Sequence, residues 1–248
     1  MRAMILAAGL GTRLRPLTDT LPKPLLPIAG HPLIVWNLLL LRRHGVTDVI
    51  INLHHLGHLI EEALGDGSPF NMRIAYSKEP MLLGTGGGLK QVEPFFDGEP
   101  FFVLNGDTLF DLDLGAMAAA HRRSRAVATM ALRADPDPDR WGAVEVDARQ
   151  YVIRINGRGR TAGEPTSKRM FAGVHLMHPR LLADVTPGRE SSIIEAYVRA
   201  IQGGETVVGY ELSGYWSDIG TPERYAQAQR DAEEGRIRLE GRLAKRET

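Results

Sequence analysis

The sequence predicts an α/β fold with a mostly parallel central sheet and helices on both faces. In the first half of the chain, short apolar runs alternate with longer stretches that have helical spacing. After residue 113 the pattern changes to several strand-like runs with little helix between them. Alternation of strand and helix is typical of βαβ crossovers, whereas closely spaced strands indicate a smaller, mixed β portion.

The first half contains four expected strands, at residues 2–7, 47–53, 72–76 and 100–104. Three expected helices lie between them, at residues 32–44, 56–64 and 87–95. Pro32 opens the first helix and Gly45 follows its end, while Gly65 follows the second. Proline is favoured in the first helical turn and glycine just after the last, so these residues support the assigned boundaries.

The second half contains the expected mixed β portion and three further helices. The expected strands are residues 126–133, 142–146, 151–155 and 170–177, and residues 157–168 form an expected polar, glycine-rich loop. Helices are expected after Asp113 and at residues 191–202 and 222–235. A chain of 248 residues fits one large α/β domain or two small ones, and length alone does not decide between them. We expect a single domain over residues 1–235, followed by a charged tail at 236–248.

Composition excludes several classes of function. The formal net charge is zero, which argues against nucleic acid as the main partner, since binding to the phosphate backbone requires a basic surface. The chain has no cysteine, so disulfides and thiolate metal sites are excluded. No apolar run approaches the roughly 20 residues of a membrane span. The short apolar N-terminal stretch is soon interrupted by Arg13 and Arg15, so we reject a signal peptide and expect a cytoplasmic protein.

A glycine-rich loop follows the first strand. Its residues 9–14 read GLGTRL, which lacks the third glycine of the dinucleotide-binding fingerprint, and Pro16 and Pro22 prevent a helix from starting where that fingerprint needs one. Residues 84–90 read GTGGGLK and miss the spacing of a P-loop. What remains is either an ordinary turn or a loop whose backbone N–H groups wrap an anion, helped by Arg13 and Lys23.

Several motifs together resemble the sugar-1-phosphate nucleotidyltransferase family. They are GLGTRLRPLT and PKPLLPIAGHPLI near the N-terminus, LGTGGG at 83–88, LNGD at 104–107 and YWSDIGTPERY at 215–225. The resemblance spans nearly the whole chain in the family's order. It implies a Rossmann-like fold and a reaction in which a sugar-1-phosphate oxygen attacks the α-phosphorus of a nucleoside triphosphate (NTP). An NDP-sugar forms and pyrophosphate leaves.

The resemblance also implies how the phosphates are held. Ala8, Gly9, Gly11 and Thr12 would wrap the nucleotide, together with Arg13 over the β- and γ-phosphates and Lys23 near the α-phosphate. Gly84, Thr85 and Gly86 resemble the segment beside the base and ribose. A reaction between two polyanions needs positive charge and a divalent metal more than a nucleophilic side chain. Arg13, Lys23 and Asp107 are therefore the expected catalytic residues.

Two aspartates are the expected ligands of Mg²⁺. Asp107 follows an apolar strand, and ligands of open parallel sheets gather at the carboxyl ends of strands. Taken alone, Asn-Gly-Asp is equally typical of a turn. By the resemblance, Asp218 completes the site. It could otherwise cap the following helix, although Thr221, directly before Pro222, fits that position better.

The expected sugar contacts are Asn105, Gly142 and Glu164. Many family members carry Glu-Lys-Pro at the last of these places, whereas this chain has Glu164 followed directly by Pro165 and a displaced Lys168. In this departure and in the stretch FAGVHLMHP the chain resembles the bacterial N-acetylmuramate-1-phosphate uridylyltransferases, and the resemblance implies UTP with N-acetylmuramate-1-phosphate or a similar sugar. The alternative is a guanylyltransferase that uses GTP with mannose-1-phosphate or heptose-1-phosphate. A monomer or a homodimer is expected.

Two rival functions are weighed against this one. Asp111 and Asp113 form the D-x-D pattern of metal-dependent glycosyltransferases, although Asp113 fits a helix start more simply. An inactive regulatory relative would be expected to lose some of the charged residues above, all of which are present. His54, His55 and His58 lack the glutamate of a zincin motif, so we interpret them as a polar cluster and not as a zinc site.

Overall fold

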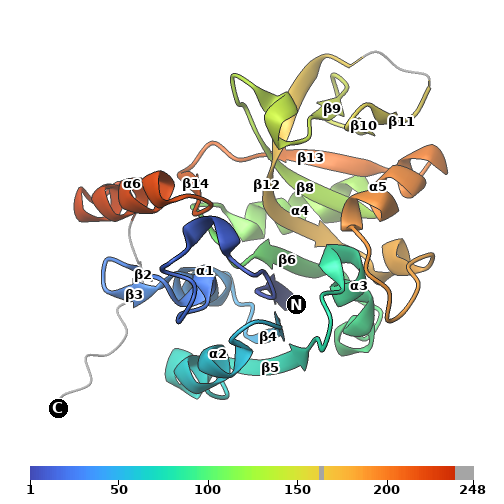
Figure 1. The fold of residues 1–248 in the computed structure, drawn as a ribbon. Coiled ribbons are helices and arrows are strands. Elements are labelled where there is room, and N and C mark those ends of the chain that lie inside the picture. Colours follow the sequence, from blue (N-terminus) through green and yellow to red (C-terminus); the bar gives the residue numbers. More distant parts are fainter. Residues whose placement is uncertain (162–164, 238–248) are drawn as a thin grey trace. The chain divides into compact units, whose positions relative to one another are not determined.

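The computed structural model describes residues 1–161 and 165–237 of the chain (Figure 1). The chain divides into two compact units. Unit 1 consists of Met1–Pro80, Asn105–Leu112 and the described residues from 214 onward, and unit 2 consists of Met81–Leu104 and Asp113–Ser213. Among the described residues, no helix combines the length and the apolar character needed to cross a bilayer.

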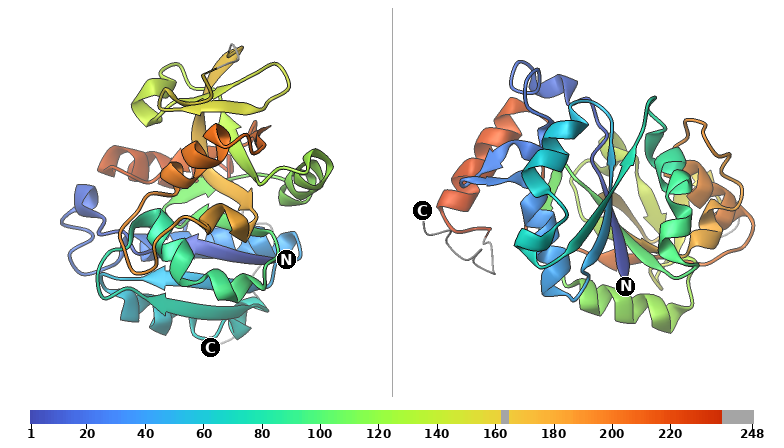
Figure 2. Two further views of the ribbon diagram at one scale, coloured as in Figure 1. Left: turned by 90° about the vertical axis from the view of Figure 1, so that its right-hand side faces the viewer. Right: turned by 90° about the horizontal axis from the view of Figure 1, so that it is seen from below.

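Unit 1 is built on three parallel strands in the order β1 (Arg2–Leu6), β4 (Asp48–Leu53) and β5 (Arg73–Lys78) (Figure 2). Its helices are α1 (Leu33–Arg43), α2 (Gly57–Leu64) and α6 (Pro222–Glu233). Two small antiparallel pairs complete it: β2 (Pro27–Ile28) with β3 (His31–Pro32), and β7 (Thr108–Phe110) with β14 (Trp216–Asp218). Apart from Asn52, the buried residues of β1 and β4 are apolar, as expected for strands buried on both faces.

Unit 2 is organised around the long strand β12 (Ser167–Met177). β6 (Phe101–Asn105) and β8 (Ala128–Arg133) pair antiparallel with its second half, and β9 (Val144–Val146) pairs with its beginning. The remaining strands are β10 (Val152–Ile155), β11 (Arg158–Gly159) and β13 (Val207–Glu211), and the helices are α3 (Gly84–Gln91), α4 (Leu114–Ser124) and α5 (Ile193–Gln202). The expected α/β class, with a Rossmann-like sheet and a mixed β portion, is confirmed.

Several details differ from the sequence-based expectation, among them the short strands β2, β3 and β11, which were not expected. α3 begins at Gly84 and not at 87, because a backbone hydrogen bond from Gly86 N–H to the Ser191 carbonyl holds its first turn. β12 begins at Ser167, inside the expected loop, because it pairs there with β9. β13 was missed, and so were β7 and β14, which have three residues each and too little pattern to detect. The single domain expected over residues 1–235 stays a prediction.

A core within unit 1 joins distant parts of the chain. Its buried members come from the N-terminal loops, α1, β7 and the C-terminal segment: Leu14, Leu26, Ile28, Leu33, Trp36, Leu109, Ile219, Ala228 and Ile237. Trp36 and the leucines at 38–41 of α1 are buried. Because this cluster packs residues 14–36 against residues 219–237, it brings the two ends of the unit together.

Candidate active site

The glycine-rich loop begins where β1 ends, at the carboxyl edge of the parallel strands of unit 1. Gly11 has φ +64°, and a Cβ there would lie 3.0 Å from Thr18 Cγ2, so the fold itself requires glycine at this place. Thr18 Oγ1 donates to the Gly11 carbonyl at 2.8 Å. Gly9 differs: its φ is not positive, and a Cβ there would meet nothing within 4 Å. The protein's own packing therefore gives no reason for glycine at position 9.

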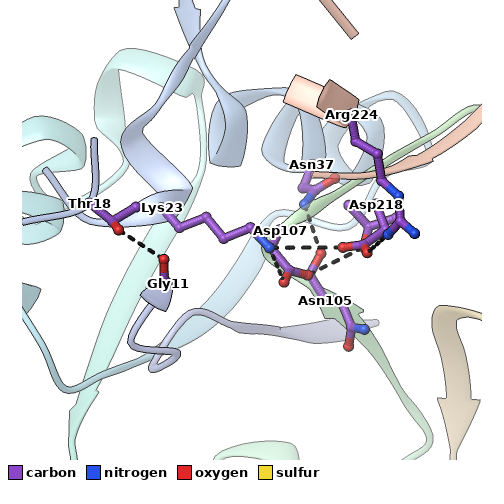
Figure 3. Close-up of polar contacts among 9 residues, drawn as sticks. Gly11, Thr18, Lys23, Asn37, Asn105, Asp107, Asp218 and Arg224 are labelled. Atoms are coloured by element: carbon purple, nitrogen blue, oxygen red, sulfur yellow. Dashed lines mark hydrogen bonds and ion pairs between the residues drawn. The ribbon is translucent and has the colours of Figure 1, made fainter. Parts of the chain in front are cut away.

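Lys23 is held in a short 3-10 turn, Lys23–Leu25, between Pro22 and Pro24. Lys23 is only 7% exposed, which is unusual for a lysine and requires an anionic partner. Its ammonium Nζ lies 2.6 Å from Asp107 Oδ2 and 3.8 Å from Asp218 Oδ1 (Figure 3). One ammonium thus faces both carboxylates that the sequence singled out.

Asp107 lies in the sharp turn between Asn105 and β7. Gly106 N–H donates to the Leu6 carbonyl at 2.9 Å, and a Cβ at Gly106 would lie 2.7 Å from that same oxygen. Only glycine lets the turn approach the end of β1 this closely. The Asp107 carbonyl accepts from Ile219 N–H at 3.0 Å, which ties the turn to the segment that carries Asp218.

Asp218 ends β14, which pairs with β7 so that Asp218 lies opposite Thr108. Its side chain is 13% exposed. Burial raises the pKa of the Asp218 carboxyl above its ordinary value, and the charge of nearby Asp107 adds to that rise. The cations of Lys23, Arg224 and Arg13 act in the opposite direction and lower it. The pKa of Asp218 therefore depends on this small group of charges.

Arg13 belongs to the 3-10 turn Thr12–Leu14 and has an exposed side chain. Its guanidinium lies beside Asp218, since a Cβ placed on Gly220 would be 3.2 Å from both Nη atoms of Arg13 and 2.6 Å from Asp218 Oδ2. Gly220 is therefore the residue that leaves room for both side chains. Sequence reasoning placed Gly220 inside a motif but gave it no function.

Arg224 is a further residue that the sequence analysis missed. It lies in the first turn of α6, and its Nη1 donates to Asp218 Oδ2 at 2.6 Å (Figure 3). Thr221 caps this helix, as expected, by accepting from Arg224 N–H. The sequence does contain a signal for this contact. Arg224 comes three positions after the N-cap Thr221, so it lies on the same side of the helix as the cap and close to the residues that precede it, Asp218 among them.

The two carboxylates suit a divalent cation. Among the residues that the structure describes, no group of three or more His, Asp or Glu side chains is arranged to hold a metal. Mg²⁺ is commonly bound by one or two carboxylates, with phosphate oxygens and waters as its other ligands. Asp107 and Asp218, both within reach of one ammonium, meet that requirement.

Asn105 contributes its backbone to the same turn. Its carbonyl accepts from Asn37 Nδ2 at 3.2 Å, and Asn37 is almost fully buried in α1. The Asn105 side chain points away from the two carboxylates in Figure 3. The structure thus brings Lys23, Asp107 and Asp218 together and leaves the amide of Asn105 outside that group.

The glycines of α3 have a packing function in unit 2. A Cβ on Gly84 would lie 2.6 Å from the Ser191 carbonyl oxygen, and one on Gly86 would lie 2.8 Å from Ser191 Oγ. Thr85 Oγ1 accepts from Ile193 N–H at 2.9 Å at the start of α5. The small residues at the start of α3 are thus needed for close packing against residues 189–193, whether or not a ligand is bound.

The expected sugar-side residues of unit 2 are partly described. Gly142 has φ +81°, and a Cβ there would lie 2.6 Å from Asn156 Oδ1, so the fold requires glycine. Lys168 pairs with Asp139 at 3.0 Å in an exposed ion pair. Glu164 lies outside the described residues.

The D-x-D aspartates have ordinary structural partners. Asp113 is the N-cap of α4 and accepts from Ala116 N–H at 2.8 Å, as expected. Asp111 lies 3.9 Å from Arg43 and is exposed. Neither contact suggests a metal site.

Comparison with known proteins identifies one family and several similar enzymes. A family model described as nucleotidyl transferase matches residues 2–235. The N-acetylmuramate alpha-1-phosphate uridylyltransferase of Neisseria meningitidis is 39% identical, over 92% of this chain and 97% of that protein. The UTP–glucose-1-phosphate uridylyltransferase of Synechocystis is 34% identical, and the mannose-1-phosphate guanylyltransferase of Mycobacterium tuberculosis is 33% identical. These matches cover 93% and 94% of this chain but only 63% and 65% of those proteins.

Two solved structures share the fold over nearly the whole chain. One is a putative glucose-1-phosphate thymidylyltransferase from Bacillus anthracis, with TM-score 0.84, 26% identity and 98% coverage of both chains. The other is HddC from Yersinia pseudotuberculosis in complex with GMP-PN, with TM-score 0.76, 25% identity, and coverage of 93% of this chain and 99% of that chain.

Proposed function

We propose that this chain, which belongs to the nucleotidyl transferase family, forms UDP-N-acetylmuramate and pyrophosphate from UTP and N-acetylmuramate-1-phosphate. The reaction class is that of its relatives: the chain is an enzyme, a sugar-1-phosphate nucleotidyltransferase. In this reaction an oxygen of the sugar phosphate bonds to the α-phosphorus of UTP. The bond from that phosphorus to the oxygen bridging to the β-phosphorus breaks, and its electron pair leaves with pyrophosphate.

The observation that carries this proposal is Lys23 held between Asp107 and Asp218, beside the glycine-rich loop. A reaction that joins two polyanions needs cations positioned in advance, because charge develops on the phosphoryl oxygens in the transition state. Lys23 would face the α-phosphate, and exposed Arg13 would cover the β- and γ-phosphates that leave. A buried lysine on a proline-stiffened turn loses little freedom when it meets a substrate.

The loop would hold the nucleotide through its backbone. Open space beside Gly9 lets a phosphate or ribose approach the main chain, and Ala8, Gly11 and Thr12 would supply neighbouring N–H groups. Gly84, Thr85 and Gly86 remain the proposed segment beside base and ribose. Asn105, Gly142 and Glu164 remain the proposed sugar contacts.

Replacing Gly9 and Gly11 by alanine should separate binding from folding. Gly9→Ala is expected to raise the KM for UTP about tenfold or more, because its methyl group enters the space used by the ligand, while Tm stays unchanged. Gly11→Ala is expected to cost about 1–2 kcal/mol of stability, since its φ is positive, and to lower Tm by about 2–8 °C. Steady-state kinetics and thermal melting of both variants check this, and equal effects of the two variants on KM and Tm would refute it.

Asp107 and Asp218 would hold Mg²⁺ through their carboxylate oxygens. When bound, the ion would neutralise charge on the phosphate oxygens. Arg224, which donates to Asp218 Oδ2, would keep that carboxylate oriented. Gly220 would keep the space between Asp218 and Arg13 clear.

The choice of substrate rests on a different observation. The uridylyltransferase of Neisseria meningitidis is 39% identical to this chain, compared with 34% for the glucose enzyme and 33% for the mannose enzyme. The second candidate is a guanylyltransferase that uses GTP with mannose-1-phosphate or heptose-1-phosphate. It is supported by the mannose enzyme at 33% identity and by the structural likeness to HddC with GMP-PN.

The test is release of pyrophosphate, with Mg²⁺, for four NTPs crossed with a panel of sugar-1-phosphates. The panel contains N-acetylmuramate, mannose, glucose, N-acetylglucosamine and heptose 1-phosphates. We expect the highest rate with UTP and N-acetylmuramate-1-phosphate. Highest activity with GTP and mannose or heptose would establish the second candidate, and pyrophosphate release at background level with every pair would contradict both proposals.

We also propose a cytoplasmic enzyme that acts as a monomer or a homodimer, with one catalytic domain over residues 1–235 and a charged tail after it. The extent of the family match, residues 2–235, supports the proposed domain. The structure does not favour the glycosyltransferase alternative, because Asp113 caps α4 by accepting from Ala116 N–H.

A further inference from the structure

A buried polar network lies at the carboxyl edge of the parallel strands, beside the glycine-rich loop. Asn52, near the end of β4, is opposite Leu6 of β1 and Ser77 of β5 in the strand register. Asn52 and Glu79 are each 3% exposed. Asparagine is disfavoured in strands, and burying an amide and a carboxyl group costs free energy unless both are hydrogen-bonded. Residues of this kind at this place call for an explanation other than core packing.

Asn52 joins the two neighbouring strand ends. Its Oδ1 accepts from Ala7 N–H at 2.8 Å, and its Nδ2 donates to Glu79 Oε1 at 2.8 Å. These two bonds determine which way the amide points, because the oxygen must face the N–H and the NH₂ must face the carboxyl oxygen. Ala7 directly precedes the residues that would wrap the nucleotide, and it lies one residue beyond the β1–β4 pairing.

Glu79 is itself held firmly in place. Its N–H donates to the Leu53 carbonyl at 2.8 Å, and its carbonyl oxygen lies 2.7 Å from Nδ1 of His54. Because a carbonyl oxygen only accepts, the His54 Nδ1 carries the hydrogen. This contact gives one member of the histidine cluster a structural function. Main chain and side chain of Glu79 are thus both anchored to the end of β4.

We propose that Asn52 is a positioning residue that holds Ala7, directly before the nucleotide-binding loop, and that Glu79 orients it. The inference rests on the proposed function, since it assigns the loop to the nucleotide. Asn52 touches no reacting atom; it acts through Ala7 on the loop that follows. Its loss should therefore weaken nucleotide binding more than it changes the sugar-phosphate KM.

The test reverses the direction of the Asn52–Glu79 hydrogen bond. In Asn52→Asp, an oxygen still accepts from Ala7 N–H, but a second carboxylate now faces Glu79 at the distance of a hydrogen bond. In the double variant Asn52→Asp/Glu79→Gln, the new glutamine donates to the new aspartate, so both bonds can form again. Asn71→Asp makes the same chemical change at an exposed position and serves as the matched control.

Binding of UTP, and of GTP in parallel, is measured by calorimetry for each variant, with thermal melting as the folding check. We expect Asn52→Asp to raise the Kd of the nucleotide about tenfold or more, the double variant to recover most of that loss, and Asn71→Asp to bind like the wild type. Steady-state kinetics should give a smaller change in the sugar-phosphate KM.

Two results would overturn the inference. One is Asn52→Asp binding nucleotide like the wild type, and the other is a double variant that binds no better than Asn52→Asp. If Asn52→Asp does not fold, the double variant decides alone, and its failure to fold or bind counts against the inference. A wild-type protein that binds neither UTP nor GTP would instead contradict the proposed function, so the two failures are distinguishable.

Discussion

Asp107→Asn is expected to lower kcat by at least about 100-fold while the protein stays folded. Loss of one charge-stabilising contact in an active site typically costs about 10²–10³ in rate. The substitution removes the carboxylate charge that lies 2.6 Å from Lys23 and one of the two proposed Mg²⁺ ligands. The Asp107 side chain is 37% exposed, so asparagine fits without a packing defect. Pyrophosphate release and thermal melting measure the two effects.

The matched control is Asp111→Asn, four residues further along the same segment. Asp111 is exposed and its ion pair with Arg43 is long, at 3.9 Å, so the turnover of Asp111→Asn should stay close to that of the wild type. An Asp107→Asn enzyme with near wild-type turnover would show that the metal assignment is wrong. A large loss of turnover in Asp111→Asn but not in Asp107→Asn would instead support a metal site at the D-x-D motif of Asp111 and Asp113.

Lys23→Ala should reduce kcat by about 10²–10³ and also change the pH dependence. The pKa of Asp218 is raised by burial and by Asp107, and Lys23 is one of the cations that limit the rise. Without Lys23 the pKa of Asp218 rises further. A carboxylate that binds metal must be ionised, and the ionised form predominates above the pKa. The acid limb of kcat/KM should therefore move to higher pH.

The measurement is a pH profile of kcat/KM for Lys23→Ala beside that of Lys78→Ala. Lys78 forms an ion pair with Glu61 on the surface, and its loss should leave both the rate and the acid limb where they are in the wild type. An unchanged or downward-shifted acid limb in Lys23→Ala would mean that Lys23 does not influence Asp218 as the geometry indicates.

Local features of the sequence were sufficient for most of the secondary structure. Apolar runs and helix-end residues located the three parallel strands of unit 1, as well as α1 and the capping residues Asp113 and Thr221. They missed β7 and β14, which have three residues each and no readable period, and they also missed the five-residue β13. They also misplaced the start of α3, which a contact with Ser191 decides.

Motifs alone could not distinguish between two reasons for a glycine. Gly9 and Gly84 look alike in the sequence, yet Gly9 faces open space whereas Gly84 is required by the Ser191 backbone. The same holds for Lys23, which could have been a solvated lysine on a turn. Its burial against Asp107, 84 residues away, follows from the three-dimensional fold.

By itself, the sequence determined the fold class, the family to which the chain belongs and the short list of charged residues that could act on phosphates. Those properties depend on residue types at short spacing, which can be read from the sequence without knowledge of the three-dimensional structure. The tertiary structure alone decided which residues meet: Lys23 between two aspartates, Arg224 on Asp218, and Asn52 between Ala7 and Glu79. Apart from Arg224 and Asp218, these contacts join segments far apart in the sequence. A shared apolar core packs residues 14–36 against residues 219–237, and the pairing of β1, β4 and β5 brings Ala7, Asn52 and Glu79 together.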